Sequence, residues 1–215
     1  LRILLDGLVL VSHLRMEGRY GLYSQHDPVE KHTHVIFHFK DGTELRYQDV
    51  RQFGTMHLFP AGQDLLEKPL NKLGLEPMDE AFTPEMLRAA VGTRSTSIKA
   101  ALLNQSYVVG IGNIYVDESL FKAGIHPAQP AKSLTDSQFH VLHEAIVSTL
   151  GASIQVGGSS IKSFVNGQGK TGDFQHQLQI YGRNAKPCIN CGTLIEKSVV
   201  AGRGTHHCPV CQPLR

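Results

Sequence analysis

The chain has 215 residues, 41% of them hydrophobic, so it can bury a sizeable core in one large domain or two small ones. No run of about 18 apolar residues occurs, which excludes a membrane-spanning helix. The net charge of +2 is uneven, because residues 157–215 carry seven Lys and Arg against two acidic residues. A basic C-terminal segment permits a polyanionic partner, but by itself it is more typical of a solvated surface.

The first 60 residues predict antiparallel strands. Apolar or alternating runs occupy 8–11, 34–39 and 44–47, and Asp41-Gly42 between the last two is a hairpin turn signal. The opening run of apolar residues around Arg2 is typical of the middle of a strand, so we expect residues that precede it.

Residues 60–82 contain three prolines and indicate a linker with one helical turn. Helices are predicted after it. Thr83 caps the first, with Pro84 at its first position; a second covers 96–104; and Asn113 caps a third that runs to about residue 123.

A fourth, long helix begins after Thr135, which forms a capping-box pattern with Gln138. Its apolar residues recur at intervals of three and four and predict one buried stripe. The stripe consists of Phe139, Leu142, Ile146, Leu150 and Ile154. A glycine-rich loop follows at residues 165–173.

The four cysteines form two Cys-x-x-Cys pairs, Cys188 with Cys191 and Cys208 with Cys211, separated by 16 residues. This spacing is typical of a four-thiolate zinc site. Paired disulfides would suit a small secreted domain, and nothing in the sequence indicates secretion. We therefore expect one Zn²⁺ per chain in a structural role, because four thiolates leave no open position for catalysis.

Three further segments permit both a functional and an ordinary structural interpretation. Residues 108–115 join two glycines to a helix start that could bind an anion, or they form a plain turn between helices. Residues 49–54 place Arg51 beside Phe53, which suits contact with a base; from the residues alone a buried Phe53 and an Arg51–Asp49 ion pair are favoured. Residues 201–205 form a glycine-flanked tip suited to phosphate, or a surface turn.

Taken in order, five segments carry a resemblance. They are residues 12–18, 31–34, 49–54, 110–115 and, between the cysteine pairs, 201–205. Their sequences in this order resemble formamidopyrimidine-DNA glycosylase over essentially all of the chain. The Gly-Ile-Gly-Asn-Ile-Tyr segment and the zinc finger are specific to this glycosylase superfamily.

The resemblance implies an α+β fold in three domains. Residues 1–76 would be the remainder of an N-terminal antiparallel β-sandwich. Residues 77–184 would form a helix-two-turn-helix DNA-binding domain, whose loop at 165–173 covers a base flipped out of the duplex. Residues 185–215 would form the zinc finger.

The implied activity is base-excision repair of double-stranded DNA that contains an oxidised purine or an abasic site. The enzyme would remove 8-oxoguanine and formamidopyrimidines and then cleave the strand by β,δ-elimination. We expect a bacterial, cytoplasmic and nucleoid-associated monomer with no membrane partner. Two alternatives stay open: an endonuclease VIII-like enzyme that removes oxidised pyrimidines, and a non-catalytic DNA-binding protein.

The site residues follow from the same resemblance. Met16, Arg51 and Phe53 match the residues that fill the space left by the flipped base, with Arg51 facing the orphan cytosine. Arg203 matches the finger arginine that contacts phosphates and is assigned the acid role in the second elimination. The positions that match DNA-binding residues are Met16, His32, Arg51, Phe53, Arg94, Lys99, Asn113, Tyr115, Ser159 and Ser160.

The family's nucleophile is an N-terminal Pro followed by Glu, and this chain begins with Leu1. The family's lysine for β-elimination would also lie upstream of Leu1. We therefore expect roughly 55–60 preceding residues, which would supply the covalent nucleophile. The 215 residues by themselves are expected to be inactive.

Overall fold

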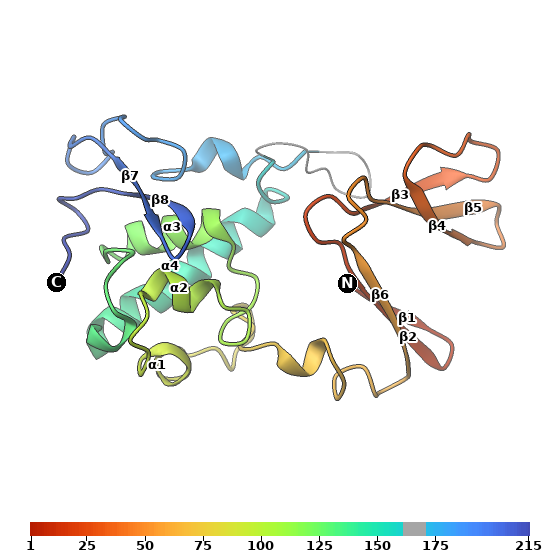
Figure 1. Cartoon of the computed structure of the whole chain (residues 1–215), viewed down its shortest axis with the longest axis horizontal. Coiled ribbons are helices and arrows are strands. Elements are labelled where there is room, and N and C mark those ends of the chain that lie inside the picture. The colour runs from red at the N-terminus through yellow and green to blue at the C-terminus, as the bar shows by residue number, and fades with distance from the viewer. Residues whose placement is uncertain (161–170) are drawn as a thin grey trace. The chain divides into compact units, whose positions relative to one another are not determined.

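The computed structural model describes residues 1–160 and 171–215, which form two compact units (Figure 1). The first unit consists of Leu1–Asn71 together with Gly157–Gln175, and the second of Lys72–Val156 together with His176–Arg215. Residues 165–170 of the predicted glycine-rich loop lie outside the described residues. The proposed domain boundaries after residues 76 and 184 stay a prediction.

The first unit contains two antiparallel sheets of three strands each. One sheet has the order β1-β2-β6, with β1 at Arg2–Leu5, β2 at Leu8–His13 and β6 at Thr55–Pro60. The other has the order β3-β5-β4, with β3 at Arg19–Ser24, β4 at Thr33–His38 and β5 at Thr43–Gln48. The predicted strands are confirmed, whereas β3 and β6 were not predicted.

The hairpin between β4 and β5 turns at Asp41-Gly42, as predicted. Gly42 has a φ of 83°, a conformation that costs glycine little because it has no Cβ. The Asp41 carboxylate accepts a hydrogen bond from the backbone N–H of Thr43 at 3.0 Å. Asp and Asn side chains commonly stabilise a turn by accepting a hydrogen bond from the backbone N–H two residues further on.

The linker contains one short helical turn, η1 at Leu70–Lys72, as predicted. Four α-helices follow in the second unit: α1 at Pro84–Val91, α2 at Ile98–Leu103, α3 at Asn113–Lys122 and α4 at Asp136–Gln155. Short helical turns also occur at Ala131–Ser133 (η2) and Phe174–Gln177 (η3). In the described part of the chain, no helix is long and apolar enough to cross a membrane.

Two of the predicted helix caps are confirmed. The Thr83 hydroxyl accepts a hydrogen bond from the N–H of Met86 at 3.3 Å. Thr135 and Gln138 form a reciprocal capping box, with each side chain bound to the other's backbone N–H. Because these caps satisfy helix N–H groups that lack an intrahelical partner, α1 and α4 begin where the sequence predicts.

The helical core contains most of the predicted stripe of α4: Phe139, Leu142, Ile146 and Leu150 are buried in it. The prediction that Ile154 is buried is wrong, because its side chain is 65% exposed. The apolar cluster ends at Leu150, and in the next turn the inward position belongs to Ser153, whose hydroxyl lies 2.7 Å from that of Tyr115. The last turn of α4 therefore buries a polar contact.

The C-terminal part of the second unit is a hairpin of β7 at Glu196–Val200 and β8 at Arg203–His207 (Figure 1). Val200 pairs with Arg203, so Ala201 and Gly202 form a two-residue connection. Both have positive φ, 51° and 72°, as a type I′ turn requires. Phe121 and Ile180 form a small buried cluster with Ile195 and two of the cysteines.

Candidate metal centre and binding surface

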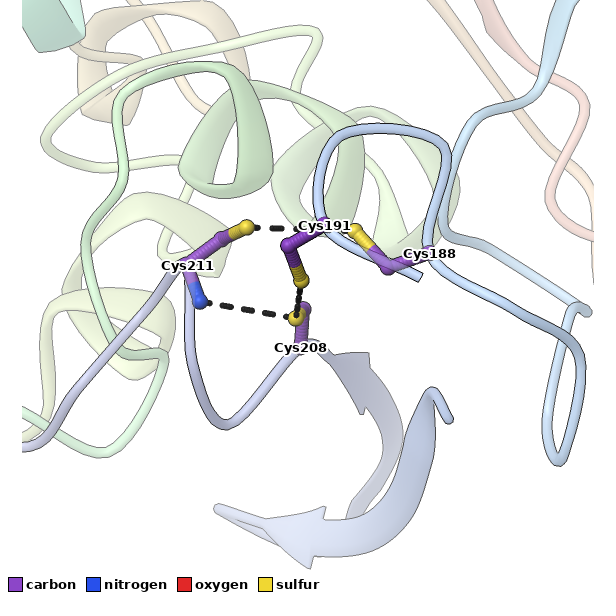
Figure 2. Close-up of side chains that lie close together, drawn as sticks. All are labelled: Cys188, Cys191, Cys208 and Cys211. Carbon is purple, nitrogen blue, oxygen red and sulfur yellow. Dashed lines mark hydrogen bonds between the residues drawn. The ribbon is translucent and has the colours of Figure 1, made fainter. Parts of the chain in front are cut away.

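The four cysteines converge on one point (Figure 2). All four Sγ atoms lie within 4.8 Å of one another, with Cys188 3.8 Å from Cys211 and Cys191 3.5 Å from Cys208. These separations exceed a disulfide bond of about 2.05 Å. They match the edge of about 3.8 Å of a tetrahedron whose corners lie about 2.3 Å from a central Zn²⁺. The donor set therefore fits zinc.

Each cysteine pair sits in a turn held by its own backbone. Gly192, with φ 76°, donates its N–H to the carbonyl of Cys188 at 2.9 Å. In the second turn the N–H of Cys211 points to the sulfur of Cys208 at 3.4 Å, and the N–H of Gln212 binds the carbonyl of Cys208. Both turns are thus formed by local contacts that direct two sulfurs to the same side.

The environment treats the thiols unequally. Hydrogen bonds from Thr193 lower the pKa of Cys191 to about 6, which favours its thiolate. Burial raises the pKa of Cys208 and of Cys211. A divalent cation offsets this cost because it binds the deprotonated sulfurs. Four sulfurs would fill a tetrahedral zinc site, so the metal would be structural.

Two polar side chains fix this region to the helices. Gln212 is fully buried; its amide donates to the carbonyl of Ile125 at 2.8 Å and accepts from the N–H of Cys208 at 3.0 Å. The carboxylate of Glu118 on α3, 2% exposed, accepts hydrogen bonds from three successive N–H groups of residues 179–181. Both contacts leave little freedom for the finger relative to α3.

Arg203 is the first residue of β8, directly after the Ala201-Gly202 turn, and its side chain is exposed. Its guanidinium makes no hydrogen bond or ion pair with the residues that the structure describes. The guanidinium is a planar fork of donors that stays charged, which suits a phosphate. The finger thus presents at its tip a positively charged side chain whose hydrogen-bond donors are available to a ligand.

The prediction that Asn113 caps the third helix is wrong. Gly112 is the N-cap and Asn113 is the first residue of α3, with no side-chain cap present. The Asn113 amide instead donates to the carbonyl of Gly204 in the finger at 2.9 Å, 91 residues away. This long-range contact leaves the first N–H groups of α3 without a capping side chain, and such a helix start attracts anions.

Lys99, expected as a DNA contact, is 0% exposed. Its ammonium donates to the Asp117 carboxylate at 2.6 Å, to the Thr205 hydroxyl at 2.9 Å and to the carbonyl of Gly204 at 3.1 Å. Lys99 and Asn113 therefore meet at the same carbonyl. Burial lowers the pKa of Lys99 and raises that of Asp117, while their mutual attraction opposes both shifts.

Arg94 and Tyr115 lie on the same unit. Arg94 is exposed, and its guanidinium carbon lies 4.5 Å from the centre of the Tyr107 ring, in cation–π geometry. Tyr115 is half-buried, with its hydroxyl bonded to Ser153 between α3 and α4. Arg94 is thus available at the surface, whereas the Tyr115 hydroxyl joins two helices.

In the first unit a buried carboxylate shapes an exposed loop. Asp49, 2% exposed, accepts hydrogen bonds from the N–H groups of Arg51 at 3.1 Å and Gly54 at 2.9 Å, and from the Tyr47 hydroxyl at 3.0 Å. Burial together with this carboxylate raises the pKa of Tyr47 to about 12, so Tyr47 remains a donor. A Cβ on Gly54 would lie 1.7 Å from that hydroxyl oxygen.

Three of the predicted residues are exposed together, Arg51 and Phe53 on this loop and Met16 on the segment between β2 and β3. Phe53 is 55% and Met16 76% exposed, and the Arg51 guanidinium lies 4.9 Å from the Phe53 ring centre and 3.5 Å from the Met16 sulfur. The favoured structural interpretation is therefore wrong: Phe53 is not core, and Asp49 binds the backbone of Arg51. The carbonyl of His32 accepts from the N–H of Asp49 at 3.0 Å, which places His32 beside this loop.

Ser159 and Ser160 lie in the short described stretch before residue 161. Ser160 accepts a hydrogen bond from the N–H of Gly172 at 2.8 Å and donates its own N–H to Gln175 at 2.9 Å. Ser159 forms a β-bridge with Asp173. A Cβ on Gly172 would lie 2.2 Å from the carbonyl oxygen of Gly158, so the two chain segments approach too closely for any other residue.

Sequence reasoning missed Asp117 and Glu118. Both are acidic residues on a helix, a pattern that normally indicates a solvated face. Their partners lie far along the chain, at Lys99 and His206 for Asp117 and at residues 179–181 for Glu118. No local signal identifies such contacts.

Three family models match the chain. The model of the formamidopyrimidine-DNA glycosylase N-terminal domain matches residues 1–56, and that of the formamidopyrimidine-DNA glycosylase H2TH domain matches residues 73–165. The model of the zinc finger found in FPG and IleRS matches residues 185–214. The last match covers all four converging cysteines and supports a structural zinc there.

The chain is also similar in sequence to formamidopyrimidine-DNA glycosylases of several bacteria. A formamidopyrimidine-DNA glycosylase of Brevibacillus brevis is 65% identical over 204 residues, which are 95% of this chain and 74% of the relative. One from Cytobacillus firmus is 61% identical over 207 residues, 96% of this chain and 76% of the relative. The chain spans about three quarters of the length of these relatives.

Solved structures agree with this assignment. A mutant Lactococcus lactis FPG in complex with a Fapy-dG-containing DNA matches with a TM-score of 0.89 at 44% identity, over 97% of this chain and 76% of that one. Lactococcus lactis Fpg in complex with an abasic-site-containing DNA matches with a TM-score of 0.88 at 44% identity and the same coverage. Matched in its domains, its sequence and its fold, the chain belongs to the formamidopyrimidine-DNA glycosylase family of DNA-repair enzymes.

Proposed function

We propose that this chain binds double-stranded DNA at oxidised purines and abasic sites, as part of an enzyme that excises the base and cleaves the strand by β,δ-elimination. One observation carries the proposal: the Arg203 guanidinium, which has no hydrogen bond or ion pair with any described residue, stands on a tip whose next carbonyl, that of Gly204, is bound by Asn113 at the start of α3. The strand that carries this exposed cation is therefore hydrogen-bonded to the uncapped start of α3. Both the cation and the helix start favour phosphate.

The loop around Arg51 supports the oxidised-purine preference. Arg51 and Phe53, on the loop bound by Asp49, are exposed together with Met16 from the neighbouring segment, as residues that replace a flipped base must be. A guanidinium can read the edge of the orphan base. This grouping favours the purine enzyme over an endonuclease VIII-like enzyme. The solved relatives with DNA that contains Fapy-dG or an abasic site point to the same substrates.

The chemistry itself is assigned by the family resemblance. An N-terminal Pro amine would attack C1′, displace the base and form a Schiff base, after which both phosphates are eliminated. Arg203 would bind the phosphate near the reacting sugar. We prefer this clamp role to proton donation, because the pKa of a guanidinium is too high for an effective acid. The zinc, held by the four cysteines, would keep the finger folded and take no part in the reaction.

Binding is tested by fluorescence anisotropy with duplexes that contain a tetrahydrofuran abasic analogue, 8-oxoguanine opposite cytosine, or an oxidised pyrimidine. We expect the abasic and 8-oxoguanine duplexes to bind more tightly than undamaged DNA, with affinity that falls as salt rises, because counterions are released. Equal affinity for all duplexes would contradict lesion recognition and leave a non-specific DNA-binding protein. A preference for the pyrimidine lesion would favour the endonuclease VIII-like alternative.

Borohydride trapping tests the assignment of the nucleophile. A protein that begins with Pro-Glu should form a stable adduct with the 8-oxoguanine duplex, and the 215 residues that begin with Leu1 should form none. An adduct formed by these 215 residues would place the nucleophile elsewhere in the chain.

A further inference from the structure

The Lys99 ammonium is saturated inside the protein. An ammonium has three hydrogens, and three acceptors surround this one: the Asp117 carboxylate, the Thr205 hydroxyl and the carbonyl of Gly204, at 2.6, 2.9 and 3.1 Å. The side chain is 0% exposed. Lys99 therefore has no donor to offer a phosphate outside the protein.

Asp117 joins two elements in the same way. One carboxylate oxygen accepts from Lys99, on α2, and the other accepts from the N–H of His206, on β8, at 2.9 Å. Asp117 itself lies on α3 and is 0% exposed. A single buried carboxylate thus ties two helices to the strand that begins with Arg203.

The network ends at the backbone of the tip. The Thr205 hydroxyl accepts from Lys99 and donates to the carbonyl of Arg203 at 2.9 Å. The next carbonyl, that of Gly204, accepts from both Lys99 and Asn113. The backbone carbonyls of Arg203 and Gly204 are therefore both held by hydrogen bonds. Arg203 and Thr205 are two residues apart in a strand, so their side chains leave on the same face.

Stability alone is a poor explanation for such a pair. Burying two charges removes their hydration, and replacing a buried ion pair by apolar residues of similar size is often neutral or stabilising. Apolar residues could fill the same space, but they could not form the directional hydrogen bonds of Lys99 and Asp117. Every one of those contacts leads to β8 or to the partner of the pair.

We propose that Asp117 and Lys99 are positioning residues for Arg203. They fix β8 on α2 and α3, so that the exposed guanidinium is presented beside the start of α3. This assigns Lys99 an internal role in place of the DNA contact that the family resemblance implies. The proposal rests on the proposed function, since it concerns how the chain grips a phosphate.

A double-mutant cycle tests it on the zinc-loaded chain with the tetrahydrofuran duplex. Asp117→Asn and Arg203→Ala should each weaken binding about tenfold or more. The double variant should bind no more weakly than Arg203→Ala alone, because Asp117 acts through Arg203 and residues in one network are not additive. The slope of log affinity against log salt should fall by about one in both single variants, since one phosphate contact is lost.

Asp136→Asn is the matched control, because Asp136 forms an exposed ion pair with Arg88 in the same unit. It should bind like the parent. If Asp117→Asn weakens binding by the same factor with and without Arg203, the residue supports the fold in general and the proposal is overturned. A parent chain that does not bind would instead refute the proposed function, so the two failures are distinct.

Thr205→Val covers the case in which Asp117→Asn does not fold or loses its zinc. This nearly isosteric change leaves the Lys99–Asp117 pair in place and removes only the link from Lys99 to the carbonyl of Arg203. We expect a several-fold weaker affinity and a normal zinc content, and Thr205→Val should have no further effect in a chain that already carries Arg203→Ala. Binding equal to the parent would overturn the proposal.

Discussion

Arg203 in the second unit and Arg51 in the first are both exposed, but different parts of the two residues are held in place. The Arg51 guanidinium has neighbours of its own, the Phe53 ring and the Met16 sulfur. The Arg203 guanidinium has no hydrogen bond or ion pair among the described residues. The backbone carbonyl of Arg203 instead accepts a hydrogen bond from Thr205, and the carbonyl of Gly204 accepts one from Lys99.

This difference matches the two tasks that we propose. A residue that reads one base must arrive with its side chain already oriented, because orientation carries the specificity. A residue that binds a phosphate needs a fixed backbone and a side chain free to adjust, because phosphate offers similar acceptors from several directions. The supports also differ: Asp49 acts within one loop, and the finger depends on a buried network and on four cysteines.

Zinc removal should separate the two regions most strongly. Metal binding supplies about 10–16 kcal/mol in small zinc-finger peptides. A strong chelator should therefore unfold the β7–β8 hairpin and abolish abasic-site binding, while β4 and β5 stay folded. Hydrogen exchange read residue by residue measures both effects. Equal loss of protection in β4–β5 would show that the two regions are not independent.

Arg203→Ala should be the strongest single substitution for binding. Losing a charge-assisted contact to phosphate is expected to weaken abasic-site binding by about 2–3 kcal/mol. Arg203→Lys should recover part of this loss, because a point charge replaces the fork. Arg88→Ala, which removes an exposed positive charge of α1, is the control for net charge. If the two alanine variants bind equally, the tip has no special role.

Gly54→Ala should damage the Arg51 loop without touching the finger. The new methyl group would meet the Tyr47 hydroxyl, which must move and give up its bond to Asp49. Overpacking of this kind costs about 1–3 kcal/mol. We expect a lower melting temperature of the first unit and an unchanged zinc content. Gly62→Ala, at a glycine with positive φ and open space around it, separates the clash from backbone strain.

Arg51→Ala should change specificity more than affinity. Loss of a guanidinium that reads the orphan cytosine should reduce the preference for cytosine over adenine opposite the lesion by about 1–3 kcal/mol. The measurement is the ratio of affinities for two duplexes that differ in that base alone. Should the variant keep the parent's ratio, Arg51 is a structural residue and the contrast with Arg203 disappears.

Acid should loosen the Arg51 loop by the smallest amount. Burial opposes ionisation of Asp49, but hydrogen bonds from Gly54, Tyr47 and Arg51 outweigh it and hold its pKa below the ordinary 3.8. Its contribution to stability is therefore present above the ordinary value and is lost as the pH falls through the lowered pKa. Unfolding followed from pH 6 downward should show a smaller loss for Asp49→Asn than for the parent. Parallel curves would contradict this.

Local signals in the sequence predicted much of this molecule. The caps at Thr83 and Thr135, the Asp41-Gly42 turn and the cysteine spacing depend on neighbours within a few residues, and the structure confirms the three turns and caps. The converging sulfurs agree with the predicted zinc ligands. Each of these features is decided by short-range geometry that a sequence displays directly.

Features that depend on distant partners were missed or misread. β6 pairs with β2, more than forty residues earlier, and its sequence alone gave no clear alternation. Lys99 meets Thr205 across 106 residues, so a lysine on a helix could not be foreseen as buried. The spacing of residues 49–54 favours a buried Phe53, but this side chain is 55% exposed, because Asp49 binds the backbone of the loop and leaves the aromatic ring at the surface.

The connection between β7 and β8 restricts how this finger can vary in length. Ala201 and Gly202 already form the shortest common hairpin connection, and Thr205 must face Lys99 while Arg203 leaves on the same side. One residue inserted after Gly204 would place these two side chains on opposite faces, because side chains alternate along a strand. Related sequences that retain phosphate binding by Arg203 can therefore substitute residues in this hairpin, but they cannot insert or delete a single residue between Arg203 and Thr205.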